Sequence, residues 1–168
     1  MSLAQRLLKT TFVLGTGDFG TQGENQVTFS GLRTILDVTY AGGNAMGTAE
    51  LAVYGMTISH MNSLSTLGMV YTQKRRNSVT VEAGNDADGY ATVFQGTITN
   101  AWPDMQAMPD VPFRVSAATG LIDALAPSAP ISVRGGADAA TLLSGLAVKM
   151  GLRFENNGVT AKLVNSYY

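Results

Sequence analysis

Cysteine is absent from this chain of 168 residues, and His60 is its only histidine. Without thiolates there is neither a disulfide framework nor a cysteine-based metal site, and one imidazole cannot supply the usual ligands of zinc. Charged residues make up only 14% of the chain and its net charge is −1, so no global field attracts it to nucleic acid. The sequence therefore predicts no metal, no cofactor, no catalytic residue, no small-molecule substrate and no specific nucleic-acid binding.

Long apolar runs are missing as well. No stretch approaches the ~20 apolar residues of a membrane span, and the N-terminal segment has no apolar core of the signal-peptide kind. We therefore expect no membrane anchor, and the lack of cysteine fits assembly in a reducing cytoplasm. The hydrophobic fraction of 45% is nevertheless enough for a sizeable core. With so little charge, part of the surface is expected to be covered by another molecule.

Glycine and short alternating runs are what the chain has in place of these features. Nineteen glycines punctuate the sequence, mostly between segments in which apolar and polar residues alternate. In the first half this alternation predicts strands over residues 10–14, 25–30, 32–40, 50–54, 78–83 and 90–99. Over residues 56–67 the apolar residues recur at helical spacing instead, which predicts one short helix. Such a series is mainly β and suits a small antiparallel barrel or a strongly curled sheet.

A proline-rich stretch at residues 101–112 predicts a boundary between two domains. Proline interrupts ladders and helices, so we expect a linker here, with a first domain over residues 1–104 and a second over residues 105–168. The second domain reads as a small α+β module that begins with a strand at residues 113–117.

The clearest helix of the chain is predicted within this module, over residues 138–150. Asp138 is its expected N-cap, and its apolar stripe includes Leu146. A hairpin is expected to turn at Asn157-Gly158, because Asn-Gly between alternating runs is typical of a type I′ turn.

Motifs that resemble catalytic or binding signatures lack their usual context. Gly15 to Gly20 matches GxGxxG, but a strand rather than a helix follows it in the sequence, so we interpret it as a connector. His60 has no nucleophile elbow to serve and is interpreted as a helix-surface or partly buried histidine. Asp86 and Asp88 lack the spacing of a calcium loop and indicate a solvated turn.

Two features predict contact with another protein chain. Ile35 falls on the otherwise polar face of its strand, where a partner would cover it. Met105 and Met108 lie in the proline-rich stretch, where their adaptable side chains suit an interface.

The only basic run consists of Lys74, Arg75 and Arg76. A solvated loop is the ordinary interpretation of three cations in a row. Docking to an acidic partner surface, or lining a passage for DNA, is the functional alternative.

Six phrases occur in an order that resembles a known family. The chain is similar to the baseplate hub proteins of contractile-tailed, Mu-like bacteriophages and prophages, the gene D-type tail proteins, and to the hub of type VI secretion spikes. The resemblance covers nearly the whole chain through Ser30-Gly31-Leu32-Arg33, Val53-Tyr54-Gly55-Met56 with His60-Met61-Asn62-Ser63-Leu64, Val81-Glu82-Ala83-Gly84-Asn85, Val93-Phe94-Gln95-Gly96-Thr97-Ile98, Ala101-Trp102 and Phe154-Glu155-Asn156-Asn157-Gly158-Val159.

The resemblance implies a virion structural protein without catalytic residues. In that family each subunit carries two tube-like β-barrels, and a homotrimer forms a pseudo-sixfold ring that joins the tail tube to the central spike. Residues 1–104 would be the first barrel. Family members are longer, so a chain that ends at Tyr168 is expected to be a truncated product or to come from a degenerate prophage gene. We also keep a carbohydrate-binding or hydrolytic tail module as an alternative, in which Glu82 and Glu155 would converge.

Overall fold

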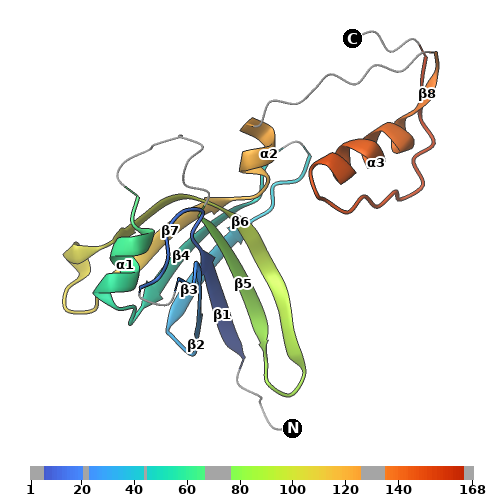
Figure 1. Ribbon diagram of the computed structural model, residues 1–168. Coiled ribbons are helices and arrows are strands. Elements are labelled where there is room, and N and C mark those ends of the chain that lie inside the picture. Colours follow the sequence, from blue (N-terminus) through green and yellow to red (C-terminus); the bar gives the residue numbers. More distant parts are fainter. Residues whose placement is uncertain (1–5, 21–22, 44, 67–76, 126–134, 165–168) are drawn as a thin grey trace. The chain divides into compact units, whose positions relative to one another are not determined.

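The computed structural model describes residues 6–20, 23–43, 45–66, 77–125 and 135–164 (Figure 1). The chain divides into two units, Met1–Ala124 and Leu125–Tyr168. The first is built on an antiparallel sheet, so the mainly β antiparallel class expected from the sequence is confirmed. The seven strands of this sheet are β1 (Leu7–Val13), β2 (Gln26–Ser30), β3 (Thr34–Thr39), β4 (Thr48–Tyr54), β5 (Ser78–Asn85), β6 (Gly89–Pro103) and β7 (Pro112–Ala118).

The order of strands across the sheet is β2-β1-β5-β6-β7-β4-β3. The long strand β6 changes its partner near Thr97: its first part pairs with β5, and its last part pairs with β7. A register shift between Ile98 and Asn100 follows the change, and Figure 1 shows β6 curving over at this point. Bulged, bent strands of this kind carry a sheet around a corner.

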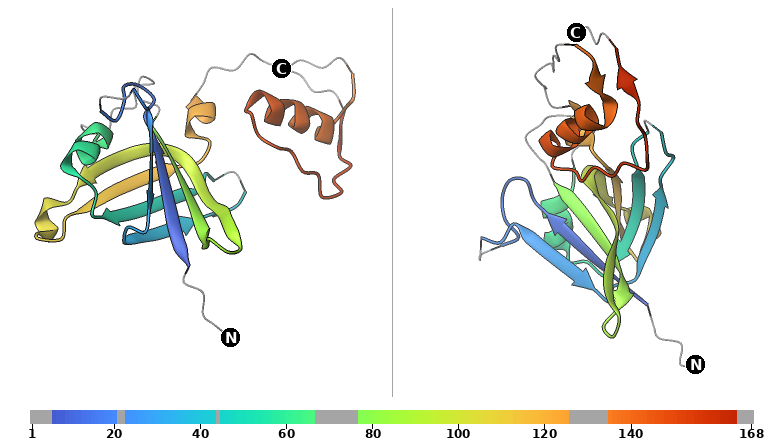
Figure 2. Two further views of the ribbon diagram at one scale, coloured as in Figure 1. Left: turned by 60° about the horizontal axis from the view of Figure 1, so that its bottom comes forward. Right: turned by 90° about the vertical axis from the view of Figure 1, so that its right-hand side faces the viewer.

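The two edge strands, β2 and β3, are consecutive in the sequence. Only residues 31–33 separate them, and Gly31 adopts a φ of 77° there, which a side chain would resist. Since the edges of the sheet are joined by so short a link, the sheet must curl until its two edges meet at one end (Figure 2). Among the described residues β2 and β3 form no ladder with each other, so the sheet is open and the expected barrel is not confirmed.

The core lies inside the curl of the sheet. Alternate residues point inward from the strands, as the alternation in the sequence predicts, although on β4 the outward Ala52 is buried as well. Phe12 on β1 and Phe113 on β7 are fully buried and meet edge to face, with ring centroids 6.5 Å apart. The inward residues of the edge strands are only half-buried and pack against this core, among them Val27, Phe29, Leu36 and Val38.

A short helix, α1 (Ile58–Leu64), follows β4 and buries Met61 and Leu64. It lies within the helix expected at residues 56–67. The connection that leaves it caps an open edge, because Thr66 donates its backbone N–H to the Ala101 carbonyl (2.8 Å) and accepts the Ala101 N–H through its hydroxyl (2.8 Å). The backbone N–H and carbonyl of Ala101, in the last part of β6, are thereby hydrogen-bonded on the side that β5 does not reach.

The expected domain boundary at residues 104/105 is wrong. Strand β7 lies after the proline-rich stretch, yet it pairs with β6 and β4 inside the same sheet. The prolines are placed where no ladder hydrogen bond is lost: Pro103 ends β6, Pro112 begins β7, and the Pro112 carbonyl accepts the Asp104 N–H at 2.9 Å. The stretch is a connection between neighbouring strands, and the first unit extends to Ala124 through helix α2 (Leu121–Leu125).

The second unit contains the predicted helix as α3 (Ala139–Lys149), next to the two-residue strands β8 (Ala137–Asp138) and β9 (Lys162–Leu163). Asp138 is the N-cap, as expected, and accepts the Thr141 N–H at 3.0 Å. The interpretation of its stripe as core is wrong for the described residues, because α3 buries none of its side chains there and Leu146 is exposed. A helix with two-residue strands beside it has too little structure around it to cover an apolar face.

The expected hairpin at Asn157-Gly158 is also wrong, although its turn is present. Gly158 has a φ of 88°, but no ladder joins the segments that flank it. The Asn156 side chain instead accepts the Val159 N–H at 2.8 Å and donates to the Val159 carbonyl at 3.0 Å. These bonds stabilise the turn locally, and β9 pairs with β8 instead.

Candidate interaction surface

The outer face of β3, β4, β7 and β6 carries a row of side chains that crosses all four strands and is apolar except on β7. The register places Ile35 opposite Ala52, Ala52 opposite Arg114 and Arg114 opposite Trp102. Directly opposite residues share a face, so these side chains follow one another across the sheet. Ile35 is 53% exposed and Trp102 37% exposed. Ala52 is buried between them, and Arg114 is the charged member. We call these four residues the apolar row.

Charged and aromatic side chains flank the apolar row along the strands. On one side the Arg33 guanidinium lies over the Tyr54 ring, 4.6 Å from its centroid. On the other side Asp37 lies opposite Glu50, which accepts a hydrogen bond of 2.8 Å from the Ser116 hydroxyl. Arginine and aromatic residues around an apolar centre are typical of surfaces that contact protein.

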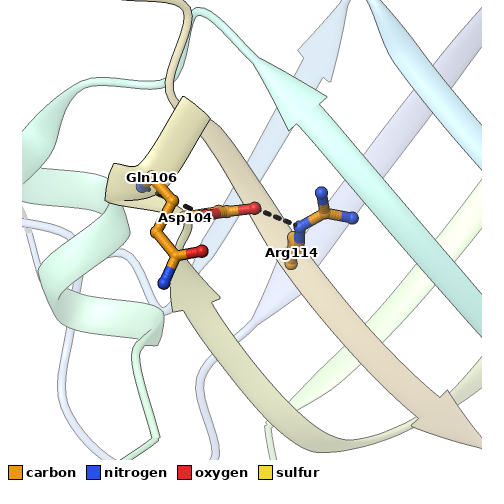
Figure 3. A network of polar contacts seen from close by, with 3 residues as sticks. All are labelled: Asp104, Gln106 and Arg114. Atoms are coloured by element: carbon orange, nitrogen blue, oxygen red, sulfur yellow. Dashed lines mark hydrogen bonds and ion pairs between the residues drawn. The ribbon is translucent and has the colours of Figure 1, made fainter. Parts of the chain in front are cut away.

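The connection from β6 to β7 is fixed to this face by an ion pair (Figure 3). Arg114 Nε donates to Asp104 Oδ2 at 2.7 Å, and the other carboxylate oxygen accepts the Gln106 N–H at 3.2 Å. Asp104 thus caps a single 3₁₀ turn, η1 (Met105–Ala107). The network holds the connection that carries Met105 and Met108, whose side chains are 54% and 71% exposed.

The hydrogen bond from Arg114, and that from the Gln106 backbone, hold the pKa of Asp104 below its ordinary value. Because the folded-state pKa is lowered, this interaction stabilises the fold at neutral pH and is lost as the pH falls through the lowered pKa. We expect Arg114→Gln to move the NMR titration midpoint of Asp104 upward, toward the ordinary aspartate value of about 3.9. An unchanged midpoint would show that Arg114 does not hold this carboxylate in solution.

The outer face of β2, β1, β5 and the first part of β6 is built differently. One row consists of Thr28, Thr11, Thr80 and Gln95, and the Thr11 and Thr28 hydroxyls are 2.9 Å apart. In the neighbouring rows serine, threonine and glutamine predominate. We call this the hydroxyl face. The next row also contains Lys9 opposite Glu82. One curled sheet thus presents a mostly hydroxyl and amide side with this charged pair, and a side of mixed apolar and charged residues.

The predicted contact residues fall in three places. Ile35 belongs to the apolar row, and the two methionines lie on the connection that Asp104 anchors. Lys74, Arg75 and Arg76 lie outside the described residues. Sequence reasoning missed Trp102, Arg114 and Arg33, which only the strand register brings beside Ile35.

His60 is half-buried on α1, between two aromatic rings. Its ring meets Phe29 and Phe19 edge to face at centroid distances of 5.4 and 5.8 Å. The Thr57 hydroxyl lies 3.0 Å from His60 Nδ1. These contacts give the histidine a packing role, in keeping with its interpretation from the sequence.

The other motifs are parts of turns. The glycine-rich segment Gly15 to Gly20 leads from β1 toward β2, and Gly17 and Gly20 have positive φ. In the β5–β6 turn the Asn85 side chain accepts the N–H groups of Ala87 (2.9 Å) and Asp88 (2.6 Å). The described residues contain no cluster of three or more histidine, cysteine, aspartate or glutamate side chains suited to a metal ion.

Within the described ranges no helix is long and apolar enough to cross a membrane. Glu82 lies on β5 of the first unit, and Glu155 belongs to the second unit.

Neither a scan against protein-family models nor a search of curated proteins finds a match for the chain.

Proposed function

We propose that this chain is a structural part of a baseplate hub, the ring that joins the tail tube to the spike in a contractile phage or prophage tail, and that it is not an enzyme. The apolar row carries this proposal. Ile35, on β3 between Arg33 and Asp37, and Trp102, on β6, both lie on the outside of a curled antiparallel sheet. A side of this composition is expected to be covered by protein in use.

We further propose that the sheet closes into a tube-like barrel in the assembled hub. The stretch from Gln26 to Thr39 pairs with β1 at its start and with β4 at its end. It can therefore act as one bent strand at the corner where the two edges meet. Six strands would then surround the core, with this stretch serving both edges.

The apolar row and the Met105–Met108 connection are proposed to contact neighbouring tail proteins. Met108 offers a direct test, since its side chain is exposed and no hydrogen-bond network depends on it. Met108→Glu should lower the amount of the protein that is incorporated into tails, because the carboxylate would be buried without a partner. Thr80→Glu, on the hydroxyl face, is the matched control. Equal incorporation of both variants would argue against contact through this connection.

The oligomeric state tests the ring itself. Light scattering of the natural gene product should give the mass of three chains, and deletion of residues 1–124 should abolish the trimer. The deletion ends at the observed unit boundary, so the sheet is removed as a whole. A natural product that stays monomeric at high concentration would contradict the proposal.

A further inference from the structure

Strand β3 is an unprotected sheet edge. It pairs with β4 on one side, and no described strand pairs with its other side. Natural edge strands usually carry a proline, a lysine or a bulge that blocks a further strand. The sequence of β3, from Thr34 to Thr39, has none of these, and its register with β4 is uninterrupted.

The backbone of β3 defines which residues can bind an added strand. The Arg33 carbonyl accepts the Tyr54 N–H at 2.9 Å, so Arg33 and every second residue after it direct their backbone groups toward β4. The intervening residues, Thr34, Leu36 and Val38, direct theirs to the free edge. An antiparallel partner must therefore present its own free groups opposite these three residues.

We propose that the partner is β3 of a second copy, paired antiparallel about a two-fold axis at Ile35. In this register Ile35 faces Ile35 of the second copy, and Arg33 faces Asp37 of the second copy on both sides of the axis. Thr34 and Leu36 of the two copies then exchange backbone hydrogen bonds, as the direction of their free groups requires. The same surface is used by both copies, as a two-fold contact requires.

The charges of Arg33 and Asp37 favour this register over those in which the two-fold axis is shifted by one or two residues. A shift of the axis by one residue toward Thr39 places Ile35 opposite Asp37, and a shift by two places Asp37 opposite Asp37. Shifts toward Arg33 place Ile35 opposite Arg33 and then Arg33 opposite Arg33. Only the register centred on Ile35 pairs opposite charges, and opposite charges stabilise a cross-strand pair whereas like charges destabilise it. On the inner face it also brings Leu32 opposite Val38 of the second copy; both side chains are half-buried at present.

The contact explains why an isoleucine is exposed on this strand. It extends each apolar row into that of the second copy. Strands of six residues give an interface below the ~800 Å² per partner of a stable complex, so we expect association that depends on concentration. The inference concerns the chain by itself and does not rest on the tail function, so either can fail without the other.

A cysteine placed at the axis tests the geometry directly, since the chain has no native cysteine. Residues in such a pair have Cα atoms about 4.5 Å apart, within the range that a disulfide bridges. Mild oxidation should therefore convert Ile35→Cys to a disulfide-linked dimer. Thr28→Cys, on the outer face of the opposite edge strand, should give little disulfide-linked dimer. Equal yields from the two variants, or no dimer from Ile35→Cys, would overturn the proposal.

Charge exchange tests the register. Arg33→Glu and Asp37→Arg should each weaken self-association in sedimentation experiments by about tenfold, because both cross-strand pairs then carry like charges. An equimolar mixture of the two variants should associate as the unchanged chain does, since both pairs of the mixed dimer again carry opposite charges. Glu82→Arg, on β5, should leave association unchanged. A mixture no stronger than its components, or an unchanged chain that never self-associates, would refute the pairing.

Discussion

Replacing Phe113 by alanine is expected to lower the free energy of unfolding of the first unit by about 3–5 kcal/mol. The ring is fully buried on β7 and meets Phe12 edge to face. Phe12 in turn packs against Phe29 on the edge strand β2, with centroids 6.1 Å apart. Loss of the Phe113 ring would therefore leave a cavity between β7 and β1, two strands that are not neighbours in the sheet order.

Urea unfolding followed by the fluorescence of Trp102, the only tryptophan, measures this change in the first unit. Ile58→Ala is the control, because this apolar side chain on α1 is largely exposed and its loss should change stability by less than about 0.5 kcal/mol. Equal midpoints for the two variants would contradict the placement of Phe113 at the centre of the core.

Gly96→Ala is expected to destabilise the same unit by about 1–3 kcal/mol, because a methyl group there has no room. Gly96 lies on β6 just before the strand changes its partner. A Cβ at this position would lie 2.8 Å from the Ala118 carbonyl oxygen and 2.8 Å from Phe94 Cζ. The Ala118 carbonyl oxygen is a backbone atom, so the steric clash could be relieved only if the corner of the sheet opened.

The matched control for Gly96 is Gly145→Ala on α3. An added Cβ has no atom within 4 Å there, and alanine is the better helix former by about 1 kcal/mol. We expect unchanged or higher stability for Gly145→Ala in thermal unfolding followed by circular dichroism. If Gly96→Ala behaved in the same way, β6 and β7 would not approach as closely as described.

The strands were predictable because alternation has a direct physical cause. In β3 the alternation put Leu36, Val38 and Tyr40 on one face and Ile35 on the other. The half-buried Leu36 and Val38 and the exposed Ile35 agree with it, whereas Tyr40 follows the strand and is exposed. Helix α3 could be predicted from the sequence equally well, because its N-cap Asp138 and its last turn follow local rules. Local periodicity and capping need no knowledge of the rest of the fold.

The domain boundary could not be read from prolines alone. A proline shows that a backbone donor is missing, but it does not show whether the chain leaves the sheet afterwards. Here Pro112 begins the strand that returns beside β6. In the second unit Asn157-Gly158 makes the expected turn, but the Asn156 side chain forms the bonds that a hairpin ladder would have formed.

The candidate surface was predictable only at Ile35, Met105 and Met108. Trp102 and Arg114 join Ile35 because the register of four strands aligns them, and register depends on pairings distant in the sequence. The one available signal was the position of the only tryptophan inside the proline-rich stretch.

Immunogold labelling of purified tails with an antibody to this chain is the most direct test of the proposed function. The proposal predicts label at the end of the tail, where the tube meets the spike, and no label along the tube. Tails from a producing strain that lack the chain altogether would contradict the hub assignment.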